Sequence, residues 1–158
     1  MIRILFIHHK LNCGGTEQAL YDLITLMDKS KFQITVLLQY GNGVWEQKYR
    51  DAGINIKFIY DCQKESNNPL VKFHNYIKRK AISEANNNEG ENLIDICFPN
   101  EFDIIVSYTV WHMPRIGLSK KCKCVLYVHF DAETNKGFRS HLDDFIPFLG
   151  KYDKICIV

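Results

Sequence analysis

The chain has 158 residues, 46% of them hydrophobic and 24% charged, which is the size and composition of one globular domain with a substantial core. Its 20 basic and 18 acidic side chains give a formal net charge of +2, a balance that disfavours a dedicated nucleic-acid-binding protein. The amino-terminal apolar run is too short for a signal peptide, and no later run reaches the roughly 20 apolar residues of a membrane-spanning helix. We therefore expect a soluble, cytoplasmic protein.

The first 60 residues predict two βα units in succession. An apolar run at residues 2–7 indicates a strand buried on both faces, and a helical stripe through residues 19–27 follows it, with Thr16 as its N-cap. A second strand is expected at residues 32–38. The next helix is expected at residues 44–52 and stops at Gly53. A third strand is expected at residues 54–60, ending at Tyr60.

The second half is less regular but continues the alternation. Pro69 opens a helical segment that reaches Ala81, and the polar residues 86–92 form a loop within the same domain. Three more strands are expected at residues 103–108, 125–129 and 155–158, with a helix at residues 142–149 between the last two. The predicted fold is α/β and Rossmann-like, a mainly parallel sheet with helices on both faces. Because the chain ends inside its last strand, we expect a domain cut from a larger protein.

Ligands of an open parallel sheet bind beyond the carboxyl ends of its strands, so the residues after each apolar run are informative. Gly14 and Gly15 precede the first helix, where backbone amides and the helix dipole favour an anion such as a diphosphate; the alternative is a simple tight turn. The dinucleotide and P-loop glycine patterns are absent, and the second strand ends in Gln39-Tyr40 rather than an acidic residue. A nicotinamide-dependent dehydrogenase and a P-loop nucleotidase are therefore disfavoured.

Histidines end two of the other predicted strands. His129 closes the fifth strand and is followed by Asp131, which places an imidazole and a carboxylate at the sheet edge; the alternative is a structural histidine. The pair His8-His9 closes the first strand, and at most one of them can face a cleft because adjacent residues of a strand point in opposite directions. Trp111-His112 after the fourth strand offer a stacking surface and a donor for a sugar or a base, or else pack against their own helix.

Several segments, in this order, carry a resemblance to a known family. They are Asn12-Cys13-Gly14-Gly15-Thr16-Glu17, Ala19-Leu20-Tyr21-Asp22-Leu23, Ile34-Thr35-Val36-Leu37, Phe102-Asp103-Ile104-Ile105-Val106-Ser107, Val128-His129-Phe130-Asp131 and Tyr152-Asp153-Lys154-Ile155-Cys156-Ile157-Val158. The chain resembles the amino-terminal domain of the GT-B-fold retaining glycosyltransferases of the family-4 type. The resemblance covers essentially the whole chain, although residues 62–101 contribute little.

The resemblance implies a role for each motif. Gly14 and Gly15 would approach the diphosphate of a nucleotide-sugar donor, and His129 would reach the transferred sugar near the reacting carbon. Sugar transfer passes through an oxocarbenium-like transition state while negative charge builds on the diphosphate, so glycine amides and an imidazole suit the chemistry. The acceptor would enter on the side formed by Thr16, Glu17, Trp111, His112 and Asp131. No metal and no cofactor besides the donor substrate is implied.

The same family binds its donor mainly through a second Rossmann-like domain, which would follow residue 158. The resemblance therefore implies that residues 1–158 are the acceptor-side domain of a hexosyltransferase in polysaccharide or glycolipid synthesis, acting on a glycan or lipid-linked acceptor. Its partner would be a carboxy-terminal domain from the same gene or a separate subunit, and the chain alone would be nearly inactive. The competing interpretation is a non-catalytic Rossmann-like module that binds a nucleotide or a protein. A small hydrolase is disfavoured because no Gly-x-Ser-x-Gly elbow is present.

One segment combines basic and apolar residues at helical spacing. The basic ones are Lys72, Lys78, Arg79 and Lys80, and the apolar ones are Leu70, Phe73, Tyr76 and Ile77. This pattern suits peripheral contact with anionic lipid at the inner face of the membrane, and an ordinary surface helix with a solvated basic face is the alternative.

Overall fold

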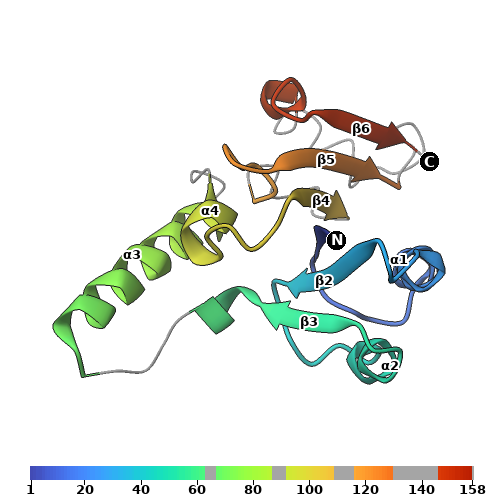
Figure 1. The fold of residues 1–158 in the computed structure, drawn as a ribbon, viewed down its shortest axis with the longest axis horizontal. Coiled ribbons are helices and arrows are strands. Elements are labelled where there is room, and N and C mark those ends of the chain that lie inside the picture. Colours follow the sequence, from blue (N-terminus) through green and yellow to red (C-terminus); the bar gives the residue numbers. More distant parts are fainter. Residues whose placement is uncertain (63–66, 87–91, 109–115, 130–145, 158) are drawn as a thin grey trace.

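The computed structural model describes residues 1–62, 67–86, 92–108, 116–129 and 146–157, which form an α/β fold around one six-stranded sheet (Figure 1). The strands lie in the order β3-β2-β1-β4-β5-β6, and every neighbouring pair is parallel. Their bounds are β1 Ile2–His8, β2 Phe32–Leu38, β3 Asn55–Phe58, β4 Ile104–Tyr108, β5 Lys123–Val128 and β6 Lys154–Ile157. The predicted Rossmann-like parallel sheet is confirmed, and all six strands lie where the sequence placed them to within two residues.

Helices occupy most of the connections between the strands. They are α1 Gly15–Leu26, α2 Glu46–Asp51, α3 Pro69–Asn86 and α4 Leu93–Cys97, with a 3-10 turn at Ile59–Cys62. Residues 146–149 are helical and confirm the end of the helix predicted before β6, whose earlier residues lie outside the described ranges. Helix α4 was not predicted, because five residues are too few to show a helical period. The strand expected to reach Tyr60 ends at Phe58, where the chain tightens into the 3-10 turn.

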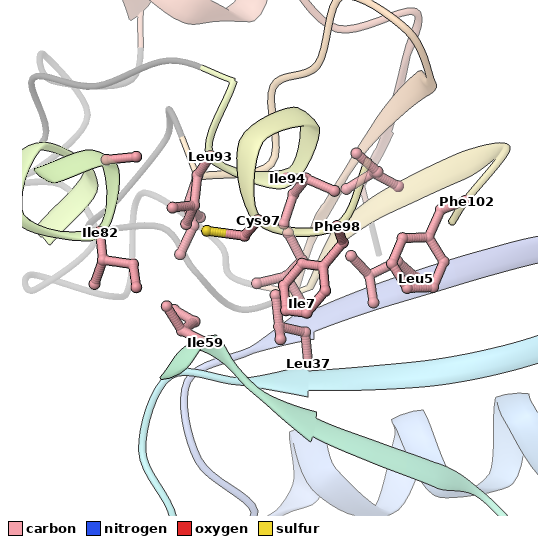
Figure 2. Packing of buried hydrophobic residues seen from close by; sticks show 13 residues of the cluster. Leu5, Ile7, Leu37, Ile59, Ile82, Leu93, Ile94, Cys97, Phe98 and Phe102 are labelled. Atoms are coloured by element: carbon pink, nitrogen blue, oxygen red, sulfur yellow. The ribbon is translucent and has the colours of Figure 1, made fainter. Parts of the chain in front are cut away.

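Alternate residues of β1 pack into two core clusters, one on each face of the sheet, and a third cluster lies around β5 and residues 148–152. Ile4 and Phe6 of β1 pack on the face covered by α1 and α2, whereas Leu5 and Ile7 pack on the face covered by α3 and α4. Figure 1 shows these two helix pairs on opposite sides of the sheet, and Figure 2 shows α4 packing over β1 and β2. A strand covered on both faces has no polar face, which explains why the sequence of β1 is apolar without alternation.

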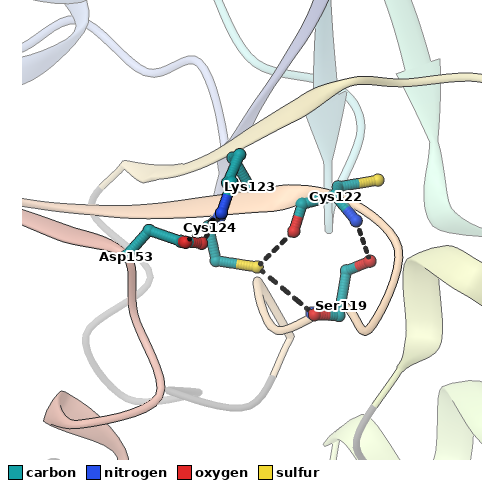
Figure 3. A network of polar contacts seen from close by, with 5 residues as sticks. All are labelled: Ser119, Cys122, Lys123, Cys124 and Asp153. Carbon is teal, nitrogen blue, oxygen red and sulfur yellow. Dashed lines mark hydrogen bonds and ion pairs between the residues drawn. The ribbon is translucent and has the colours of Figure 1, made fainter.

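Strands β4 and β6 both begin directly after an aspartate that bridges to the neighbouring strand. Asp103 donates its backbone N–H to the Arg3 carbonyl of β1 (2.9 Å), while its carboxylate accepts the Arg3 backbone N–H (2.8 Å) and pairs with the guanidinium (2.6 Å). Asp153 repeats this arrangement on β5: its N–H donates to the Cys124 carbonyl and its carboxylate accepts the Cys124 N–H, both at 2.8 Å, while pairing with Lys123 (Figure 3). The two Asp-containing segments therefore share one structural role at the amino ends of the strands.

Candidate functional site

The strand order reverses between β1 and β4, which are neighbours in the sheet although about a hundred residues separate them. In open parallel sheets the crevice beyond the carboxyl ends of the strands at such a reversal is where ligands bind. His8 is the last residue of β1, Tyr108 is the last residue of β4, and His129 directly follows β5. Helix α1 begins seven residues after β1 ends. We therefore built the candidate site from these strand ends and this helix.

Five rings meet at this edge of the sheet, on the face covered by α1; we call them the ring cluster. Tyr108 lies at its centre, with its ring centroid 4.3 Å from that of His129, 5.0 Å from Tyr127, 6.0 Å from His8 and 6.3 Å from Phe6. Tyr108 belongs to β4, and the rings around it come from β1 and from the end of β5. All five lie on one face because every second residue of a strand points to the same face. The topology thus brings two histidines, distant in sequence, onto opposite sides of one tyrosine.

His8 is the most unusual member of the ring cluster. Only 2% of the residue is exposed, and neither of its ring nitrogens has a hydrogen-bond partner among the described residues. Burial lowers the pKa of His8 to about 4, and nearby His9 lowers it further, while the Lys10 backbone opposes this shift. The imidazole is therefore neutral at physiological pH, and an unpaired buried polar group of this kind costs on the order of 1–3 kcal/mol.

His129, the residue predicted to reach the transferred sugar, shares these properties to a smaller degree. It is half-buried, and burial lowers its pKa. Its Nε2 atom is buried and has no hydrogen-bond partner in the part of the chain that the structure describes. Two neutral imidazoles with unused hydrogen-bonding atoms therefore flank Tyr108. A group that enters from the carboxyl edge of the sheet can supply the missing partners, since buried nitrogens of native proteins are rarely left unpaired.

The His8-His9 pair divides as predicted, with one imidazole on each side of the strand. His8 joins the ring cluster, whereas His9 forms a 2.9 Å hydrogen bond with the Gln39 side chain and packs its ring on Tyr40. Gln39, the residue after β2, thus contacts the residue that follows β1. Sequence reasoning left His8 without a role and missed Tyr108 altogether. The available signal was the aromatic rings at alternate positions 6 and 8 of β1 and at position 108 of β4. The pattern is hard to recognise because the residues between them are also apolar, as is usual in a parallel sheet.

The first turn of α1 lies at the same edge as the ring cluster. Gly14 is its N-cap, with extended backbone angles and no side-chain hydrogen bond to the helix amides. The prediction that Thr16 caps the helix is wrong, because the helix already begins at Gly15 and Thr16 lies inside the first turn. Its hydroxyl instead donates to the Glu17 carboxylate at 2.9 Å. The amides at the start of α1 therefore have no side-chain cap from Gly14.

Glu17 is largely buried beneath the start of α1, a position that its charge did not predict. A Cβ atom placed on Gly14 would lie 2.5 Å from its Oε2 atom, so the carboxylate packs directly against that glycine. The Tyr49 hydroxyl of α2 donates a hydrogen bond to the Glu17 backbone carbonyl (2.6 Å), which holds the first turn of α1 against α2. Gly15 differs, since no atom of the described ranges lies within 4 Å of a Cβ placed there. An anion at this helix end would therefore approach Gly15 freely but would meet the Glu17 carboxylate beside Gly14.

The structure places only part of the predicted site. Gly14, Gly15, Thr16 and Glu17 are contiguous at the start of α1, and His129 lies in the ring cluster. Trp111, His112 and Asp131 lie outside the described residues. Within the ranges described, no group of three His, Cys, Asp or Glu side chains is arranged to hold a metal ion. Five cysteines in the described ranges take part in no disulfide bond. None of the described helices is long and apolar enough to cross a membrane.

Comparisons of this chain with protein-family models, with curated proteins and with solved structures found no match.

Proposed function

We propose that this chain is the amino-terminal, acceptor-side domain of a GT-B-type retaining glycosyltransferase, similar to those of family 4. Three features support the proposal: the Rossmann-like strand order, the uncapped start of α1 directly after β1, and the position of His129 at the same sheet edge. The enzyme would move a hexosyl group from a nucleotide sugar to a glycan or a lipid-linked acceptor. A second, carboxy-terminal domain would complete the cleft and bind most of the donor.

The single observation that carries the proposal is the pair of unpaired imidazoles around Tyr108. His8 and His129 are both neutral and both hold buried ring nitrogens without partners. Sugars present many hydroxyl groups that donate and accept hydrogen bonds, so they match neutral imidazoles better than a charged ligand would. We propose that His129 orients the transferred sugar. We also propose that Glu17, released from Gly14, accepts a hydrogen bond from the acceptor hydroxyl.

The amides at the start of α1 would stabilise the departing diphosphate. Negative charge builds on that group as the glycosidic bond breaks, and helix N-termini stabilise such charge. Gly15 is the residue beside which the diphosphate would lie, because it alone of the two glycines has open space around its Cα atom. This arrangement predicts that a methyl group at position 15 blocks the ligand without disturbing the fold.

The experiment that tests the proposal is a crystal structure of the chain soaked with UDP-glucose, together with a solution titration by the same probe. Density for the diphosphate beside Gly15 and for the sugar toward His129 is expected. In the titration, followed by amide chemical shifts, Gly15→Ala should weaken binding several-fold. Gly150→Ala is the matched control, because that glycine also has nothing within 4 Å of a placed Cβ. Binding that Gly15→Ala leaves unchanged would contradict the proposal.

A second candidate, a non-catalytic module that binds a nucleotide or a protein, is favoured by one observation. The Glu17 carboxylate packed on Gly14 places a negative charge where a diphosphate was expected. Absence of any chemical-shift change at residues 14–17 with UDP-glucose or with pyrophosphate would support a protein-binding module. Turnover of UDP-glucose by the chain alone would contradict the requirement for a second domain.

A further inference from the structure

Helix α3 is covered by the rest of the protein over only part of its length. Figure 1 shows it projecting away from the sheet, with its carboxyl-terminal end beside α4. At that end, Ala81 and Ile82 are buried in the core that also contains α4 residues. Nearer its start the helix carries four large apolar side chains that remain in solvent, with exposed fractions of 71% for Leu70, 60% for Phe73, 63% for Tyr76 and 37% for Ile77.

The exposed apolar residues continue a stripe whose last member is buried. Leu70, Phe73, Ile77 and Ala81 are spaced by three or four residues, which places them along one side of a helix. Ala81 meets the core, Ile77 is partly covered, and Leu70 and Phe73 are largely exposed. Single exposed apolar residues are common on proteins, but a row on one helix side indicates a surface that another phase or molecule covers.

The charge of α3 indicates what covers the stripe. The helix holds four basic residues, Lys72, Lys78, Arg79 and Lys80, and one acidic residue, Glu84, which lies 3.7 Å from Lys80. Its formal charge of +3 exceeds the +2 of the whole chain, so all of the net positive charge is concentrated on this helix. A second copy of the chain would set +3 against +3 across the stripe, which disfavours self-association through α3.

We infer that α3 lies on an anionic lipid surface, with Leu70, Phe73 and Ile77 inserted at the boundary between headgroups and acyl chains. Basic residues beside an apolar stripe on a helix of modest hydrophobicity are the features of helices that lie in the membrane interface. Lys72 and Lys80 are exposed and lie about one helical turn before and one turn after Tyr76. Both would contact the headgroups. This inference is independent of the proposed sugar transfer, since it depends on α3 alone.

Co-sedimentation with lipid vesicles tests the inference on the whole chain. We expect binding to vesicles of equal parts phosphatidylglycerol and phosphatidylcholine, little binding to phosphatidylcholine alone, and release by salt. Leu70→Gln with Phe73→Gln should weaken binding at least about tenfold, because the variant removes inserted apolar area. Leu26→Gln with Val44→Gln is the matched control, since both residues are exposed apolar side chains on other elements. All four positions are exposed, so the variants are expected to fold.

The charge contribution has its own matched pair of variants. Lys72→Gln with Lys80→Gln should weaken binding to the anionic vesicles, whereas Lys31→Gln with Lys120→Gln, which remove the same charge elsewhere, should change it far less. Equal effects of the two pairs, equal binding to neutral vesicles, or binding that survives Leu70→Gln with Phe73→Gln would each overturn the inference. So would sedimentation velocity showing a dimer that the same apolar variant dissociates, because the stripe would then be covered by a second copy.

Discussion

The two edges of the sheet differ in whether their polar side chains have hydrogen-bond partners. At the amino edge, Asp103 and Asp153 each satisfy a backbone N–H of the neighbouring strand and a cation at once. At the carboxyl edge, His8 and His129 keep buried nitrogens without partners around Tyr108. Strands β1, β4 and β5 take part at both edges, so the contrast lies between the two ends of the same strands.

The amino edge therefore stabilises the fold by itself, whereas the carboxyl edge holds the unpaired groups at which we propose that a ligand binds. A carboxylate that accepts an amide and pairs with a cation contributes to the folded state in the absence of any ligand. An unpaired buried imidazole lowers stability until another molecule supplies its partner. Substitutions at one edge should therefore leave the behaviour of the other edge unchanged.

The largest expected effect is a loss of stability in mild acid caused by His8. Its pKa is lowered to about 4 by burial, so the unfolded chain takes up the proton first as the pH falls. The His8 contribution is complete above about pH 6.5 and is lost progressively down to about pH 4, by about 3 kcal/mol in all. Urea unfolding at a series of pH values measures this. His8→Phe should remove the loss between these pH values, and a slope that survives the substitution would contradict the assignment.

His8→Phe should also stabilise the protein at neutral pH. The phenyl ring fills the same place beside Tyr108 and Phe6 but leaves no unpaired nitrogens, so we expect a gain of about 1–3 kcal/mol. Thermal unfolding followed by circular dichroism measures the change. His9→Phe is the control, because His9 holds a hydrogen bond to Gln39 and its loss should destabilise rather than stabilise. Destabilisation by His8→Phe would mean that the imidazole is paired in solution.

The amino edge should respond at a lower pH than the carboxyl edge. The Arg3 hydrogen bonds hold the pKa of Asp103 down to about 2, so its contribution is present above about pH 4 and is lost as the pH falls toward 2. Asp103→Asn should therefore flatten the unfolding profile below pH 4 and leave the His8 window unchanged. It should also lower the melting temperature at pH 7. Asp28→Asn removes a carboxylate from a surface turn and should have the smaller effect on melting.

The smallest expected effect is at the start of α1. Gly15→Ala should stabilise the protein by up to about 1 kcal/mol, because alanine loses less backbone entropy than glycine in a helix and finds no neighbour within 4 Å. Gly14→Ala is the informative comparison, since its Cβ must displace the Glu17 carboxylate. Differential scanning calorimetry of both variants measures the difference. A destabilised Gly15→Ala would show that position 15 is already filled.

The strands were readable from the sequence because each is a short apolar run bounded by glycine, proline or polar residues. Helix bounds were less accurate: α1 begins at Gly15 rather than after Thr16, and the five-residue α4 shows no period. The candidate site was only partly predictable. His129 and the glycine pair follow strands in the sequence, whereas the meeting of His8 with Tyr108 depends on β1 pairing with β4 across about a hundred residues. Local patterns contain no information about that pairing.

The aspartate bridges also bear on how the strands find their correct alignment during folding. A slip by one residue would turn every apolar side chain to the wrong face, but a slip by two would keep both cores apolar. Hydrophobic burial alone therefore does not exclude the second error. A two-residue slip of β4 along β1 would move Asp103 by about 6.6 Å and break its bonds to both the amide and the guanidinium of Arg3. Asp103 and Asp153 thus act as register markers for the two strand pairs that they join.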